Sequence, residues 1–138
     1  MSGEPRNWQP HVSAMVRGAM KSLDAKQTTG AGTAFDMGAA YAAFGLNLRR
    51  GTTSSTNESS SAAVVLQGSL DGTNYYTLGA SVTVNSVAGS LTRSTNAIPV
   101  QFVRFSITSF TTSAGNSTAG GENKIPITGW IAAGIGSS

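Results

Sequence analysis

The chain contains no cysteine and a single histidine in its 138 residues. The absence of cysteine excludes a disulfide scaffold, a thiolate metal site and a cysteine nucleophile. A Ser-His-Asp triad needs a histidine held by a rigid scaffold, and a zinc site needs three or four ligands. The single histidine, His11, lies in an N-terminal segment that holds Pro5 and Pro10, so the sequence predicts neither kind of site.

Charge is also scarce, since charged residues make up 11% of the chain against a usual share of about 25%. The nine Lys and Arg residues are dispersed, and Arg49-Arg50 is their only adjacent pair. A nucleic-acid binder would need a basic cluster with interleaved aromatic residues. We therefore expect no nucleic-acid partner, despite a calculated isoelectric point near 9.7.

The six acidic residues are dispersed too, and of these Asp24 and Asp36 alone lie near predicted strands. A glycosidase needs two carboxyl groups facing one pocket, and no spacing here predicts that. Asp71 and Asn74 offer too few oxygens for a calcium site. The Gly30-Ala31-Gly32 segment lacks the later glycines of a phosphate-binding fingerprint. Both segments favour turns, and we expect a non-enzymatic protein without a metal or cofactor.

Long apolar runs are missing as well. No stretch approaches the roughly 20 apolar residues that span a bilayer, and residues 1–11 lack the apolar core of a signal peptide. We therefore expect synthesis in the cytoplasm and no membrane partner. A surface with little charge and much serine and threonine is nevertheless typical of proteins that work outside cells.

The chain is rich instead in serine, threonine and glycine, with 19, 16 and 17 residues respectively. This composition favours short strands joined by many turns over helices. Apolar residues alternate with polar ones in the stretches 41–50, 62–70, 100–109 and 124–133. Turn signals recur about every ten residues, which predicts an all-β protein: one antiparallel β-sandwich of eight or nine short strands.

Several details of this sandwich can be predicted. Asp71-Gly72 between two apolar stretches is a strong hairpin signal. The alternation places Val64, Leu66 and Leu70 on one buried face. The polar stretches 51–61 and 111–123 hold no side chain suited to a core, and we expect them to be exposed loops.

The domain organisation predicted is an N-terminal arm, residues 1–21, followed by a single sandwich domain, residues 22–138. The apolar residues after Pro10 fit the spacing of a helix, but the alternate set of Val12, Ala14, Val16 and Met20 fits a strand nearly as well. The arm is thus either a first strand or a segment that docks on a neighbouring subunit. The candidate partner-binding residues are Trp8, His11, Val12, Met15, Val16 and Met20.

Four segments occur in an order that resembles a group of small structural proteins of tailed phages. They are GAGTAFDMG at 30–38, VVLQGSLDGTNYYTLG at 64–79, QFVRFSITS at 101–109 and ITGWIAA at 127–133. The group has the patterns "LxGSLDGTNWxxLG", "xRYVRxxxTS" and "VTAWxAA", and the resemblance covers residues 22 to 133. A similar rhythm occurs in discoidin-like and galactose-binding sandwiches, although Tyr75-Tyr76 and Phe102 replace their Trp and Tyr here. A jelly-roll or discoidin-like sandwich is the fold that this implies.

The resemblance implies a virion component, first of all a capsid decoration (cement) protein that binds the outer capsid surface and stabilises the shell. Its expected partners are the major capsid protein or other virion proteins, and further copies of itself, since many cement proteins act as trimers. A tail or neck subunit of the same fold is one alternative. A carbohydrate-binding module is another, in which Tyr75 or Trp130 would stack on sugar.

Overall fold

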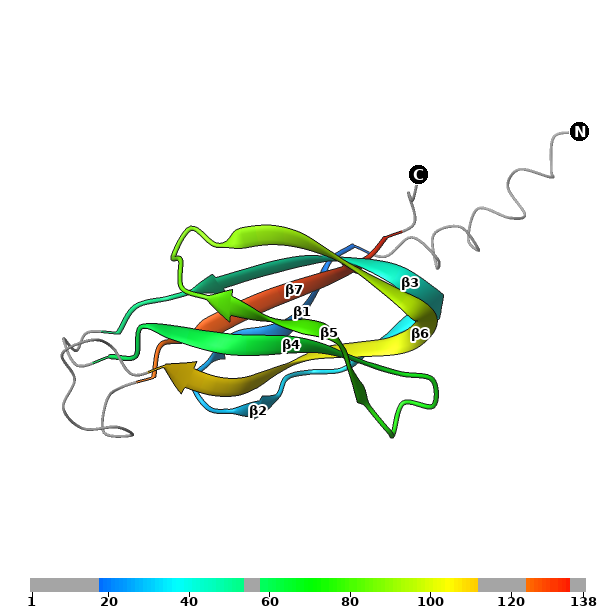
Figure 1. Ribbon diagram of the computed structural model, residues 1–138, viewed down its shortest axis with the longest axis horizontal. Coiled ribbons are helices and arrows are strands. Elements are labelled where there is room, and N and C mark those ends of the chain that lie inside the picture. Colours follow the sequence, from blue (N-terminus) through cyan, green and yellow to red (C-terminus); the bar gives the residue numbers. More distant parts are fainter. Residues whose placement is uncertain (1–17, 54–57, 112–123, 135–138) are drawn as a thin grey trace, which may run out of the picture.

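The computed structural model describes residues 18–53, 58–111 and 124–134. These residues are all-β and form one antiparallel sheet of seven strands, in the order β1-β7-β3-β6-β4-β5 with β2 beside β6 (Figure 1). The strands are β1 (Met20–Lys26), β2 (Gly30–Ala31), β3 (Phe35–Arg50), β4 (Ser61–Ser69), β5 (Tyr76–Val84), β6 (Ser90–Thr111) and β7 (Ile127–Ala133). The all-β prediction is confirmed.

The described residues form seven strands in place of the eight or nine short ones expected, and two of the seven are long. β3 has 16 residues and β6 has 22. Two glycines with positive φ lie inside strands and bend them. Gly38, with φ 84°, lies within β3, and Gly79, with φ 73°, lies within β5. Glycine adopts such angles without the steric cost that other residues pay, so the chain changes direction while the strand continues.

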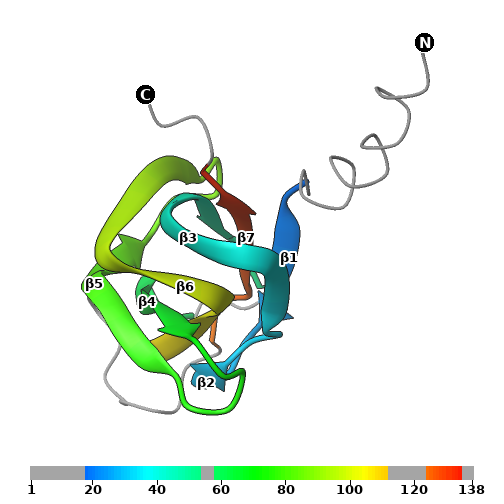
Figure 2. The same ribbon diagram turned by 90° about the vertical axis from the view of Figure 1, so that its right-hand side faces the viewer.

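The two long strands fold the sheet over on itself. The first part of β6 pairs with the second part of β3, from Ser90↔Leu48 to Thr95↔Ala43. Its second part pairs with β4, from Phe102↔Ser69 to Thr111↔Ser61. Figure 2 views the end at which β3 and β6 curve from one layer to the other. One layer holds β1, β7 and the adjoining parts of β3 and β6, and the other holds β4, β5 and the rest of β6, which is consistent with a single β-sandwich.

The core lies between the two layers and follows the alternation in the sequence. β3 contributes Phe44, Leu46 and Leu48, and β6 contributes Val103, Phe105 and Ile107. The opposite layers therefore supply large apolar side chains at every second residue, as the period of a strand requires. The remaining buried apolar residues are Leu23, Met37, Ala62, Val64, Val65, Leu66, Val84, Val100, Ile125, Ile127 and Ile131.

Two expectations about individual positions fail. Leu70, placed by the alternation on the buried face of β4, is 66% exposed because β4 ends at Ser69. The loop 51–61 was expected to be exposed, but Ser59 and Ser61 are buried and Ser61 belongs to β4. The Ser59 hydroxyl accepts a hydrogen bond from the N–H of Ile125 at 3.1 Å, which ties this segment to the residues before β7.

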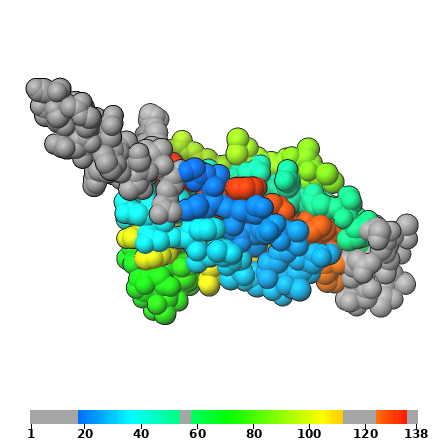
Figure 3. Space-filling view, turned by 180° about the vertical axis from the view of Figure 1, so that it is seen from behind, coloured from blue at the N-terminus to red at the C-terminus, as the bar shows by residue number. Residues whose placement is uncertain are grey.

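One side of the sandwich is closed by hydrogen bonds around the buried Ser22 of β1. Its hydroxyl donates to the carbonyl of Thr33 at 2.8 Å and accepts from the N–H of Phe105 at 2.9 Å. The N–H groups of Thr33 and Gly32 donate to the carbonyls of Ser22 and Phe105, each at 2.8 Å. β1, β2 and the chain between them consequently form a continuous surface on this side (Figure 3).

Candidate functional site

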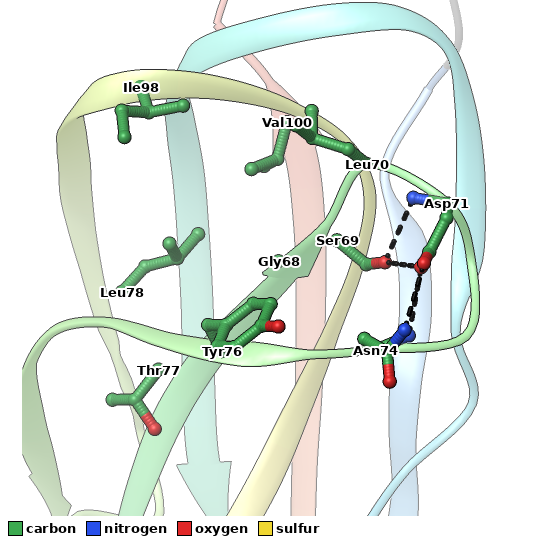
Figure 4. A pocket seen from close by; sticks show the side chains of 10 residues that line it. All are labelled: Gly68, Ser69, Leu70, Asp71, Asn74, Tyr76, Thr77, Leu78, Ile98 and Val100. Carbon is green, nitrogen blue, oxygen red and sulfur yellow. Dashed lines mark hydrogen bonds between the residues drawn. The ribbon is translucent and has the colours of Figure 1, made fainter.

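A hollow of about 550 Å³ lies where the β4–β5 hairpin meets the bend of β6 (Figure 4). Tyr76 and Leu78 lie on one side of it, and Leu70, Ile98 and Val100 on the other. Three of these side chains are unusually exposed for their type: Leu70 at 66%, Tyr76 at 69% and Ile98 at 64%. The remaining lining residues are Gly68, Ser69, Asp71, Asn74 and Thr77.

The floor of the hollow depends on Gly68. A Cβ atom at this position would lie 2.7 Å from Leu78 Cδ1 and 2.7 Å from Val100 Cγ2. The side chains of Leu78 and Val100 therefore rest directly over the glycine, and no larger residue fits beneath them. In the sequence, Gly68 is simply the first residue of the Gly-Ser-Leu-Asp-Gly pattern, and its position under Leu78 and Val100 is not indicated there.

The turn beside the hollow is built on Asp71, as the Asp-Gly signal predicted. One carboxylate oxygen, Oδ1, accepts from the backbone N–H groups of Thr73 and Asn74, each at 2.8 Å, and from the Ser69 hydroxyl at 2.9 Å. The other oxygen accepts from the Asn74 amide at 2.9 Å. Gly72 provides the left-handed backbone with φ 77°. The polar groups at this rim thus bond mainly to one another.

These bonds lower the pKa of Asp71 well below its ordinary value near 3.8. The largest contribution is the backbone N–H of Asn74, followed by that of Thr73 and by the side chains of Asn74 and Ser69. Hydrogen bonds to a carboxylate favour its charged form. The carboxylate therefore stabilises the folded turn at neutral pH.

We expect this contribution to disappear in acid. Because the folded pKa is depressed, the stabilisation is fully present above the unfolded value near 3.8 and is lost as the pH falls below it. Asp71→Asn should therefore lower the melting temperature at neutral pH, and the gap from the wild type should shrink at about pH 2.5. Calorimetry at both pH values measures this, with Asp24→Asn on an exposed side chain of β1 as control. A gap that stays constant would contradict the role given to the carboxylate.

The exposed aromatic residue of the hollow is Tyr76. The sequence had instead pointed to Tyr75 and Trp130 as the rings that could stack on a sugar. The Tyr75 ring is covered by the Arg104 guanidinium, 3.9 Å from its centroid, and the Trp130 ring lies 5.1 Å from Lys21 Nζ. The Tyr76 side chain, in contrast, is largely exposed to solvent. Alternation alone would not have marked it, because Tyr76 shares its face of the strand with Leu78, which packs against the core.

Of the candidate partner-binding residues, Met20 is the one that the structure describes, and it lies apart from the hollow. Met20 begins β1, where it pairs with Ile131 and is half-buried, so the last two residues assigned to the arm belong to the sheet. The remaining arm candidates lie outside the described residues: Trp8, His11, Val12, Met15 and Val16.

The acidic residues of the described segments are engaged locally. Asp24 pairs with Lys21 at 3.5 Å, and Asp36 accepts from the Gln101 amide at 2.8 Å. Glu58 accepts from the hydroxyl and the N–H of Thr53, and these bonds, with a smaller contribution from Arg50, lower its pKa. In residues 18–53, 58–111 and 124–134, no three His, Cys, Asp or Glu side chains gather as a metal site would require. That part of the chain also holds no helix long and apolar enough to cross a membrane.

The described residues form an all-β domain with an apolar hollow at one end. Comparison of the chain with protein-family models, with curated proteins and with solved structures finds no match.

Proposed function

We propose that this chain is a non-enzymatic structural protein of a tailed-phage particle, and in particular a capsid decoration protein that binds other virion proteins through the hollow. The observation that carries the proposal is the ring of Leu70, Tyr76 and Ile98, which a monomer leaves largely in water. Contiguous exposed apolar surface of this kind marks a site of protein contact. The four phage-like segments support the virion assignment, and synthesis in the host cytoplasm accords with it.

The chemistry of the hollow favours a side chain over a sugar. Its wall is formed mainly by Leu70, Leu78, Ile98 and Val100, and the oxygens of Asp71 are already bonded within the turn. A sugar needs polar partners for its hydroxyl groups, whereas an apolar side chain needs only contact. Burying one such side chain contributes about 1.5–3 kcal/mol. Many copies on a shell would add these contacts and brace it.

The proposal is tested with purified particles that lack the protein, to which the full-length chain is added back. Leu70→Asp and Tyr76→Asp place a charge at the rim of the hollow, and we expect each to reduce retention on the particles at least tenfold. Leu91→Asp is the matched control, because Leu91 is 80% exposed and is not part of the hollow. Retention that is unchanged in both rim variants would overturn the role of the hollow.

Electron microscopy of the same particles separates the decoration protein from its alternative. Labelled protein on the outer shell supports the proposal. Label confined to the tail axis would replace it with a tail or neck subunit of the same fold.

A further inference from the structure

The turn that borders the hollow contains a dipeptide whose backbone is prone to chemical rearrangement. Asp71-Gly72 is the only Asp-Gly pair in the sequence, and the sequence has no Asn-Gly pair. In an unstructured chain, the glycine nitrogen of such a pair attacks the carboxyl carbon of the aspartate, because glycine has no side chain to hinder it. A C–N bond forms as the carboxyl OH and the amide proton leave together as water, and a five-membered succinimide results. Water then opens the ring at either carbonyl, which restores aspartate or gives isoaspartate, whose main chain runs through the former side-chain carboxyl.

The turn requires both residues of this pair. Gly72 has φ 77°, an angle that residues with a side chain rarely adopt, and a Cβ atom there would lie 3.3 Å from the Phe102 ring. The Asp71 carboxylate accepts from the backbone N–H groups of Thr73 and Asn74, which orients the chain that leads into β5. The reactive dipeptide is therefore built into the fold, and the rate at which it reacts depends on the geometry of the folded turn.

The nitrogen that would attack is hydrogen-bonded in the folded turn. The N–H of Gly72 donates to the hydroxyl oxygen of Ser69 at 2.9 Å. Attack requires this nitrogen to lose its proton and to approach the carboxyl carbon of Asp71, so the bond to Ser69 has to break first. Ser69 is 1% exposed, and water therefore does not readily replace the lost bond. The cost of leaving the hydroxyl without this partner adds to the barrier of the reaction.

The carboxyl group that would be attacked is held in its unreactive form. Only a protonated carboxyl group can release water, and hydrogen bonds keep Asp71 ionised by lowering its pKa below the ordinary value. Its Oδ1 accepts from the N–H groups of Thr73 and Asn74, each at 2.8 Å. Its Oδ2 accepts from the Asn74 amide at 2.9 Å (Figure 4). Rotation of the carboxyl group toward the nitrogen of Gly72 would break these bonds, so the folded turn disfavours both the charge state and the geometry that the reaction needs.

Ser69 connects the two halves of this arrangement. A serine hydroxyl offers one donor and two acceptor sites. Here it donates to Asp71 Oδ1 at 2.9 Å and accepts from the N–H groups of Gly72 at 2.9 Å and of Asp71 at 3.2 Å. We infer that Asp71-Gly72 is a latent isoaspartate site and that the Ser69 hydroxyl suppresses its modification in the folded protein. Isoaspartate would add one carbon to the main chain between Leu70 and Tyr76, which line the hollow. This consequence for the hollow rests on the proposed function, whereas the reaction at Asp71 does not.

The test measures the rate at which isoaspartate accumulates at position 71, by mass spectrometry of proteolytic fragments after prolonged incubation at slightly acidic pH. The reference is a synthetic peptide of residues 66–78, which has the same sequence without the fold. We expect the full-length protein to react at least tenfold more slowly than the peptide. Ser69→Ala should accelerate the reaction at least fivefold in the full-length protein and should have no effect in the peptide. Ser81→Ala is the matched control, because it removes an exposed hydroxyl of β5 outside the turn, and it should leave the rate unchanged.

Equal rates for the full-length protein and the peptide would overturn the inference, because the turn would then give no protection. A Ser69→Ala protein that is folded by circular dichroism and reacts no faster than the wild type would overturn it as well. If that variant does not fold, Asn74→Ala takes its place, since it removes the hydrogen bond from the side-chain amide to Asp71 Oδ2. It should react at least twofold faster, and an unchanged rate would overturn the role of the bonded carboxylate. Isoaspartate-containing protein that is still retained on particles would contradict the hollow alone, so failure of this inference and failure of the proposed function give different results.

Discussion

Replacing Gly32 by alanine is expected to lower the free energy of unfolding by about 3 kcal/mol or more, since overpacking and loss of buried hydrogen bonds each cost about 1–3 kcal/mol. A Cβ atom at Gly32 would overlap the carbonyl oxygen of Ser22 and would lie 2.7 Å from Leu23 Cδ2. The obstacle is mainly backbone, which cannot rotate away as a side chain can. Relief would require β1 to move and would break the bonds from Thr33 to Ser22 and from Gly32 to Phe105.

Equilibrium unfolding in urea measures the effect. Gly45→Ala is the matched control, because a Cβ atom at Gly45 of β3 would meet nothing within 4 Å. Alanine in a strand is no worse than glycine, so the control should stay within about 0.5 kcal/mol of the wild type or gain slightly. If the free energy of unfolding of Gly32→Ala were as close to the wild type as that of Gly45→Ala, the close packing of Gly32 against Ser22 would be contradicted.

Replacing Phe105 by alanine is the second large effect, with an expected loss of about 3–5 kcal/mol. The ring is 1% exposed and lies between the layers, where a Cβ atom at Gly129 of β7 would meet it at 2.8 Å. Its removal leaves a cavity that the neighbouring strands cannot fill without losing their register. A loss of this size is a large part of the roughly 5–15 kcal/mol that stabilises a typical domain.

Phe102→Ala is the control for residue type, because Phe102 lies on the opposite face of the same strand and is only half-buried over the Asp71–Gly72 turn. We expect a clearly smaller loss, measured by the same urea transition. Equal losses for Phe102 and Phe105 would contradict the assignment of the two faces of β6.

The sequence predicted the hairpin that lines one side of the hollow, but not that this hairpin lies against the bend of β6. Asp71-Gly72 indicated a hairpin, and the hairpin is there, with the Asp71 carboxylate accepting from the N–H groups of Thr73 and Asn74. Leu70 was assigned to the core because its spacing continues that of Val64 and Leu66, yet β4 stops one residue earlier. Ile98 carries no local signal, because it becomes part of a site only when β6 bends toward Tyr76. The spacing of apolar residues along one strand does not indicate which distant segment of the chain will pack beside it.

By itself, the sequence determined the all-β class, the buried faces of β3, β6 and β7, the turn at Asp71 and the absence of thiol chemistry, because composition and alternation act residue by residue. Only the tertiary structure decided that the stretches around Gly38 and Gly79 continue as bent strands, that β6 pairs with β3 along one edge and from Phe102 onward with β4 along the other, and that an apolar hollow lies beside this bend. Strand pairing joins residues far apart in the chain, and the free energy that selects it comes from burying both layers together.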